Sequence, residues 1–218
     1  MKNKSDVEKI ILILKETYPD AKCSLDFSTP FELLISVMLS AQCTDDRVNK
    51  TTPSIFSKYN TPSDFANINL KELEELIHPC GFYRNKAKNI ISCSRKILQD
   101  FDGIVPNNIN DLTSLPGVGR KSANVVMLEA FDTPVGIAVD THAKRISNKI
   151  GLSNSEDPLK IEQDLLKIID KKYYYEDEDF SYDITLIVRK EKLNETEIKE
   201  VVSEFDRMNK SVKIRKME

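Results

Sequence analysis

The stretch from Leu115 to Val126 constrains the fold more than any other part of this 218-residue sequence. It reads LPGVGRKSANVV, so Gly117 and Gly119 flank one apolar residue directly before a helix-forming run. Glycine adopts backbone conformations that side chains forbid, and a tight turn at this point directs the first amides of the next helix outward. Such amides and the positive helix end can bind a phosphate without reading sequence, although a GxG turn by itself is usually an ordinary helix–helix turn.

Composition is that of an ordinary globular protein, with 40% hydrophobic and 31% charged residues. The N-terminal apolar run, Ile10 to Leu14, is too short for a signal peptide or a membrane span. Four cysteines without a CxxC pair favour reduced thiols over a disulfide framework or a metal site. We therefore expect a cytoplasmic monomer with no membrane partner.

Charge is unevenly distributed along the chain. From residue 173 onward, 12 acidic and 9 basic residues account for the net charge of −3, so residues 1–172 are neutral overall. Between Phe82 and Ile97 there are five basic residues and no acidic one. A local basic patch suits contact with phosphates, although such runs are more often solvated faces.

Periodicity predicts an all-α protein. The expected helices span about 5–18, 31–39, 45–58, 70–78, 84–100, 108–114, 120–131, 141–150 and 157–170. No strand pattern occurs before residue 180. Beyond it, Phe180 to Arg189 alternates as a short strand would, and Glu195 to Met208 has the spacing of an amphipathic helix.

The hairpin string matches the helix–hairpin–helix DNA-binding motif and is joined by three further motifs. These are FELL at 31–34 running into LSAQCTD at 39–45, GFYRNKA at 81–87 and VDTH at 139–142. With these four motifs in this order, residues 1–172 resemble the endonuclease III family of DNA glycosylases with abasic-site lyase activity. The resemblance implies a helix–hairpin–helix glycosylase fold: a six-helix barrel over 22–135, a second helical lobe from 1–21 and 136–172, and a divergent segment at 173–218.

By this resemblance, Lys121 is the catalytic amine and Asp140 the catalytic carboxylate, facing each other across a DNA cleft. The helix dipole disfavours an ammonium group at a helix N-terminus, which should lower the pKa of Lys121. A neutral amine can attack the sugar C1′, expel the base and form a Schiff base. Asp140 can stabilise positive charge on the sugar or move protons, and it can also be an N-cap. Without the motif, Lys121 would be interpreted as a phosphate contact only.

The resemblance also assigns the residues that handle DNA. Gln42 fills the gap left by the flipped nucleotide, and Phe82 wedges beside it; core packing is the alternative for Phe82. His142 lines the pocket or is simply a structural histidine. Phosphates are expected to contact the hairpin and the basic patch, at Pro116, Gly117, Val118, Gly119, Arg120, Arg84, Lys86 and Lys88.

The segment after residue 172 departs from the family. Members usually end in four cysteines, spaced C-x6-C-x2-C-x5-C, that hold a [4Fe–4S] cluster, whereas this chain has no cysteine after Cys93. We therefore expect no cofactor and no metal ligand, with Cys43, Cys80 and Cys93 buried as small apolar residues. The divergent segment is either a lineage-specific replacement or the product of a frame disruption.

Three functions compete at this point. The first is a bifunctional glycosylase and lyase that removes damaged pyrimidines from double-stranded DNA and acts on abasic sites. The second is a relative of the adenine-mismatch glycosylases, which typically carry Ser at the position of Lys121 and a catalytic Glu near the second helix. The third is a catalytically impaired DNA-binding protein that uses the hairpin alone.

Overall fold

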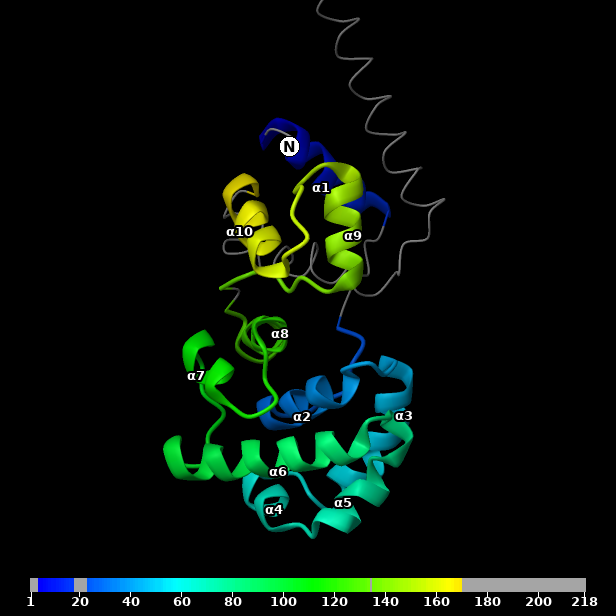
Figure 1. The fold of residues 1–218 in the computed structure, drawn as a ribbon, viewed down its shortest axis with the longest axis vertical. Helices are drawn as coiled ribbons and strands as arrows, with labels where there is room; N and C mark the ends of the chain where they lie inside the picture. Colours follow the sequence, from blue (N-terminus) through cyan, green and yellow to red (C-terminus); the bar gives the residue numbers. More distant parts are fainter. Residues whose placement is uncertain (1–3, 18–22, 134, 170–218) are drawn as a thin grey trace, which may run out of the picture. The chain divides into compact units, whose positions relative to one another are not determined.

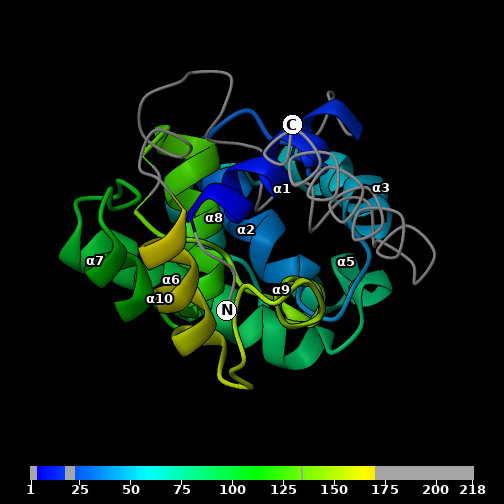
Figure 2. The same ribbon diagram turned by 90° about the horizontal axis from the view of Figure 1, so that it is seen from above.

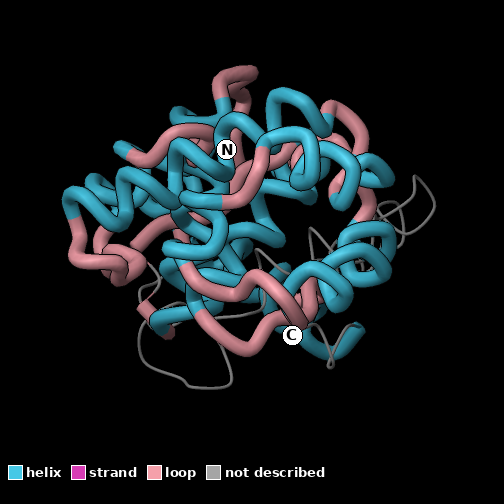
Figure 3. Tube along the Cα trace, turned by 90° about the horizontal axis from the view of Figure 1, so that it is seen from below, coloured by secondary structure: helices cyan, strands magenta, loops and turns pink. Residues whose placement is uncertain are grey.

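The computed structural model describes residues 4–17, 23–133 and 135–169, and in these ranges helices joined by loops are the regular secondary structure (Figures 1 and 3). The chain divides into two compact units. One is formed by residues 23–135, and the other combines residues 1–22 with the chain from 136 onward. The predicted strand at 180–189, the helix at 195–208 and the rest of the divergent segment lie outside the described residues.

The unit of residues 23–135 contains the six helices that the sequence predicts there. It also contains a short helix, α4, and a 3-10 turn, η1, both of which have proline in their first turn. The sequence analysis predicts no separate element at either position, although proline suits the first turn of a helix because no intrahelical partner is needed there. The elements are α2 (Pro30–Ser40), α3 (Asp45–Phe56), α4 (Pro62–Asn67), α5 (Leu70–Leu76), η1 (His78–Cys80), α6 (Tyr83–Asp100), α7 (Ile109–Ser114) and α8 (Arg120–Phe131).

The long helix α6 crosses this unit and organises its packing (Figure 1). Helices α4 and α5 contact α6, while α2 contacts α3, α6 and α8. Phe65 of α4 is fully buried, and its ring meets the ring of Phe31 edge to face, with 5.6 Å between the centroids. Such burial of a Phe side chain stabilises the fold by about 1.5–3 kcal/mol. Other fully buried side chains are Leu33, Leu34, Ile35, Leu39, Ile55, Leu73, Ile77, Ile90 and Ile97.

The other unit is described over α1 (Lys4–Thr17), α9 (Thr141–Ile150) and α10 (Pro158–Ile168) (Figures 1 and 2). Its core joins α1 to α9 and α10 although they lie far apart in the sequence. The residues of this core are Val7, Ile10, Ile11, Ile13, Ile137, Val139, Ala143, Ile146, Ile150, Leu152, Ile161, Leu165 and Ile169. Among the helices of the described ranges, none has the length and apolarity needed to cross a membrane.

Candidate nucleic-acid interface and catalytic residues

Helices α6 and α8 begin differently from the other helices between α2 and α10. Seven helices in this range begin with a Thr, Asn or Asp whose side chain accepts a hydrogen bond from a first-turn amide. At α6 the cap position is Phe82 and at α8 it is Gly119, and neither provides a side-chain cap. Neither helix has an acidic residue in its first turn. A long helix that begins in this way is suited to bind an anion such as a DNA phosphate.

The hairpin before α8 depends on Gly117 for two separate reasons. Its φ of +80° lies in the left-handed region, where side chains are strained. A Cβ atom at Gly117 would also lie 2.8 Å from Cβ of Asn89 in α6 and 3.0 Å from Cε of Met38 in α2. Val118, at the tip between the glycines, is 6% exposed and its amide donates to the Leu115 carbonyl at 3.1 Å. The hairpin is therefore packed against the unit, with Gly119 and Arg120 exposed beside it.

Replacing Gly117 by Ala should displace the hairpin and weaken binding to any duplex DNA. The left-handed backbone alone costs an alanine about 1–2 kcal/mol, and the contacts with Asn89 and Met38 add to this cost. Gly103→Ala is a matched control, because Gly103 has a φ of +79° while its added Cβ would meet only Leu98 Cδ2, at 3.5 Å. Fluorescence anisotropy with undamaged duplex and thermal unfolding measure both effects. Equal losses of DNA affinity in the two variants would contradict the role of the hairpin.

Lys121 is the second residue of α8 and is exposed, next to the exposed Arg120. Both exposed side chains therefore lie at the N-terminal end of α8, directly after the hairpin. Asp140 belongs to the other unit. The expectation that Lys121 and Asp140 face each other thus remains a prediction.

Asp140 is the N-cap of α9, as the sequence analysis predicts in addition to its catalytic role. Its Oδ1 accepts hydrogen bonds from the backbone amides of His142 and Ala143, both at 2.9 Å. These bonds hold the half-buried carboxylate at the start of the helix. His142 is half-buried in the first turn, and both interpretations of its side chain remain open.

Gln42 and Phe82 have an unusual backbone for residues with side chains. Their φ angles are +55° and +44°, and within the described part of the chain only Asp102 and Asp132 share this property among non-glycine residues. Strained backbone of this kind is often found at functional sites. Phe82 is 67% exposed, so core packing is excluded for it, and Gln42 is exposed as well. Both side chains are thus available to a ligand.

Lys86 was predicted to contact a phosphate, but its side chain is buried. It is only 8% exposed, and its Nζ donates to the carbonyl of Leu39 at 2.8 Å and to that of Cys80 at 2.7 Å. Burial lowers the pKa of Lys86, while the thiols of Cys43 and Cys80 act in the opposite direction. An ammonium group turned into the protein in this way does not reach a phosphate. Its two hydrogen bonds instead link the C-terminal end of α2 to η1. They thereby also link the turn that contains Gln42 to the turn that contains Phe82.

Two further basic residues of the predicted patch, Lys96 and Arg95, also bond to groups within the protein. Lys96 pairs with Asp100 at 2.5 Å, and Arg95 Nε donates to the Ala66 carbonyl at 3.1 Å. Arg84 and Lys88 remain as exposed cations at the start of α6, with the Arg84 guanidinium 5.2 Å from the centre of the Tyr83 ring. Arg84 and Lys88 are thus the two predicted phosphate contacts of the patch that are exposed.

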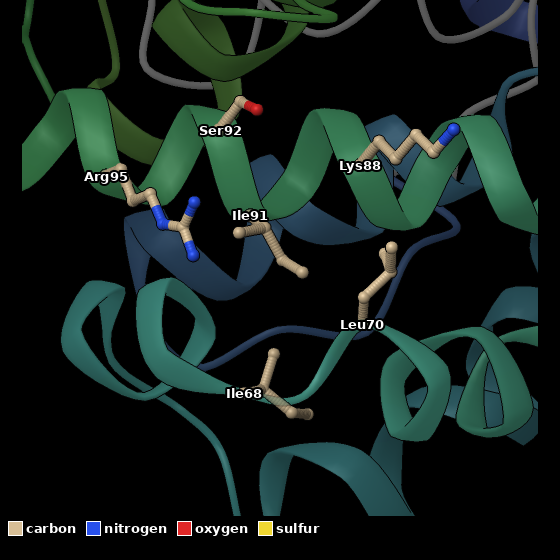
Figure 4. Close-up of a pocket in the computed structure, with 6 residues that line it drawn as sticks. All are labelled: Ile68, Leu70, Lys88, Ile91, Ser92 and Arg95. Atoms are coloured by element: carbon tan, nitrogen blue, oxygen red, sulfur yellow. The ribbon is translucent and has the colours of Figure 1, made fainter.

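A shallow pocket of about 250 Å³ lies along α6, between this helix and the link from α4 to α5 (Figure 4). Figure 4 shows Ile91 pointing toward Ile68 and Leu70, with Lys88 and Arg95 to either side. None of the residues predicted to act in catalysis lines it. We therefore do not assign it as the catalytic pocket.

The cysteines present do not suit a [4Fe–4S] cluster, which requires several thiolates at one place. Cys93 is fully buried in α6, and burial raises the pKa of its thiol to about 12. Cys80 is 1% exposed, while Cys43 and Cys23 are only partly buried. Burial as small apolar residues thus describes Cys80 and Cys93.

Comparison with known proteins identifies the family. Residues 35–171 match the model of the HhH-GPD superfamily base excision DNA repair proteins. Endonuclease III of Synechocystis sp. is 52% identical over 166 residues, 76% of each chain, and endonuclease III of Bacillus subtilis is 44% identical over 173 residues, 79% of this chain and 78% of the relative. The chain belongs to the HhH-GPD superfamily of base excision DNA repair proteins.

Solved structures agree with this assignment. A trapped endonuclease III–DNA covalent intermediate is 42% identical, with a TM-score of 0.79 over 86% of this chain and 85% of the solved one. A thermostable thymine-DNA glycosylase shares the fold at 23% identity, with a TM-score of 0.70 over 87% and 86% of the two chains. The predicted all-α glycosylase fold with a helix–hairpin–helix is therefore confirmed, and so is the classification of this HhH-GPD protein as a DNA-binding repair enzyme.

Proposed function

We propose that Lys121 is the nucleophile through which this chain, a DNA glycosylase and abasic-site lyase of the endonuclease III type, removes damaged pyrimidines from duplex DNA. The observation that carries the proposal is the place of Lys121, exposed in the first turn of α8 directly after the packed Gly117–Gly119 hairpin. A covalent intermediate with DNA was trapped for an endonuclease III that is 42% identical, which supports an attacking side chain in this fold.

The chemistry has two steps that a primary amine can perform. The neutral amine of Lys121 attacks C1′ of the damaged nucleotide, the bond from C1′ to the base breaks, and the base leaves with the bonding electrons and takes up a proton. The amine then loses its own protons as the sugar ring opens to give an imine. Removal of a proton from C2′ expels the 3′ phosphate by β-elimination, and water releases Lys121 from the imine.

The other predicted residues support these steps. The negative charge of Asp140 stabilises the positive sugar carbon while the base departs. Gln42 and Phe82, both exposed on left-handed backbone, occupy the space that the flipped nucleotide leaves. His142, one residue beyond the first residue of α9, contacts the extruded base. We further propose a cytoplasmic monomer that binds duplex DNA containing damaged bases or abasic sites.

Borohydride trapping separates this function from the two alternatives. Reduction of the imine should leave a covalent adduct between the protein and a duplex that contains an oxidised pyrimidine. An adenine-mismatch glycosylase acting without a lysine nucleophile would excise adenine from a mismatch and form no adduct with the oxidised pyrimidine. A protein that binds DNA only through the hairpin would shift the duplex in a gel but would neither cut nor become trapped.

Charge reversal at Arg84 and Lys88 should weaken binding to damaged and undamaged duplex alike. Both cations are exposed near the uncapped start of α6, and phosphate contacts carry no sequence information. Each lost contact should also reduce the slope of log affinity against log salt by about 0.9. Lys71→Glu, at an exposed position of α5, is the control. Binding that falls only for damaged duplex would contradict the positioning role.

Regarding cofactors, we propose that the chain carries no [4Fe–4S] cluster. Residues 173–218 contain no cysteine, and the thiol of Cys93 is buried with a raised pKa. Anaerobically purified protein should therefore be colourless and free of iron. Stoichiometric iron together with a visible charge-transfer absorption band would contradict the proposal that no cluster is bound.

A further inference from the structure

Two turns carry the residues proposed to fill the duplex, and both hold them on left-handed backbone. In the turn between α2 and α3, Gln42 has a φ of +55°, and the amide of Cys43 donates to the Ser40 carbonyl at 3.1 Å. In the turn between η1 and α6, Gly81 and Phe82 have φ angles of +65° and +44°. Such backbone persists at residues with side chains only where the surrounding structure holds it. A bond within one turn fixes that turn alone and leaves its position relative to the other turn open.

Lys86, the fourth residue of α6, is hydrogen-bonded to both sides of this pair of turns. Its backbone amide donates to the Phe82 carbonyl at 3.2 Å and its Nζ to the Cys80 carbonyl at 2.7 Å, so Lys86 holds the second turn at both ends. The same Nζ donates to the Leu39 carbonyl at 2.8 Å, three residues before Gln42. Helix α3, which follows the first turn, also packs against η1. Lys86 therefore fixes the position of one turn relative to the other.

A charged donor is suited to this place because the Leu39 carbonyl lies at the end of a helix. Helix α2 ends at Ser40, and the last carbonyls of an α-helix have no intrahelical partner. A cation near this end also interacts favourably with the helix dipole, and α2 has no basic residue of its own in its last turn. Lys86 is shielded from water, which strengthens its bonds to both carbonyls. One ammonium group thus stabilises the end of α2 and the turn before α6 together.

We propose that Lys86 is a positioning residue for base extrusion, which sets the two turns so that Gln42 and Phe82 enter the duplex together. This role rests on the proposed function, in which those two side chains occupy the space that the flipped nucleotide leaves. Lys86 is buried, so it acts through the turns and not by touching DNA. The bond-breaking step belongs to Lys121, and loss of Lys86 therefore acts earlier, on the extrusion of the nucleotide.

Lys86→Met and Lys86→Gln test this role in the full-length protein. Methionine keeps an unbranched side chain without a donor, whereas glutamine keeps a shorter, neutral donor and serves in its place if the methionine variant does not fold. Arg95→Met is the matched control, because Arg95 lies on the same helix and its Nε donates to the Ala66 carbonyl of α4 at 3.1 Å. All rates are compared at a temperature below the lowest Tm of the set.

Single-turnover excision of an oxidised pyrimidine should slow by about tenfold or more in the Lys86 variants, as small misplacements in an active site do. Arg95→Met should excise at the wild-type rate. On a duplex with 2-aminopurine opposite an abasic-site analogue, the fluorescence change that reports unstacking should be smaller for the Lys86 variants than for Arg95→Met. A lowered Tm with wild-type excision and fluorescence would overturn the proposal, and so would equal losses in Arg95→Met.

A double-mutant cycle tests whether Lys86 acts through the two turns. The Lys86 replacement is introduced into the wild type and into a variant that carries both Gln42→Ala and Phe82→Ala. It should slow excision much less in the second background, because the side chains that it positions are already absent there. Equal slowing in both backgrounds would overturn the proposal. Wild-type protein that excises nothing would refute the proposed function, whereas the 2-aminopurine signal would still decide the role of Lys86.

Discussion

Lys121→Gln should abolish borohydride trapping and strand cleavage while leaving most of the DNA affinity in place. Glutamine has no amine that could form an imine, so loss of the nucleophile removes the covalent step altogether. The packed hairpin and the α8 amides are untouched by this change, because Gly117 and Gly119 keep their conformation. The measurement combines the yield of trapped adduct with anisotropy on a duplex that contains an abasic-site analogue.

Arg120→Gln is the neighbouring control for this experiment. Arg120 is exposed in the same turn of α8, so its loss should weaken phosphate binding. At saturating protein this variant should still be trapped on DNA. Adduct formation by Lys121→Gln at the wild-type rate would assign the chemistry to another amine, and equal loss of trapping in both variants would indicate a DNA-binding role for Lys121.

Asp140→Asn should slow base excision by on the order of 10²-fold or more without unfolding the protein. The change removes a negative charge, and electrostatic or proton-transfer contributions of one group are typically of this size. Asparagine is as good an N-cap as aspartate, so the bonds to the amides of His142 and Ala143 can be kept. Single-turnover kinetics and the Tm are therefore expected to separate catalysis from capping.

Asp157→Asn makes the matched change at another helix. Asp157 caps α10 by accepting from the Leu159 amide at 3.0 Å. Its replacement should change the Tm about as little as Asp140→Asn does and should leave excision at the wild-type rate. If Asp140→Asn also excised at that rate, Asp140 would be a cap and nothing more.

The bonds made by Lys86 support both the turn that contains Gln42 and the turn that contains Phe82. A buried ammonium bound to two carbonyls is costly to remove, because the carbonyls of Leu39 and Cys80 would lose a charged donor. Changes at Lys86 should therefore affect both turns, and they are not suitable as simple probes of phosphate binding.

Local sequence was sufficient for several features of this repair enzyme. The helix boundaries of α6, α8 and α9 follow from periodicity and from Gly119 and Asp140 at their starts, because these signals act over a few residues. The hairpin string located the packed turn at Gly117 and Gly119 for the same reason. Short α4 and η1 were missed, since elements of six or fewer residues carry little periodicity.

Side-chain direction and pairing were decided only by the packing of distant segments. The sequence places Arg84, Lys86 and Lys88 together in one basic run, but helical rotation turns Lys86 inward to the carbonyls of Leu39 and Cys80 and leaves the other two exposed. Such contacts join residues far apart in the chain, and no local pattern encodes which of them will meet.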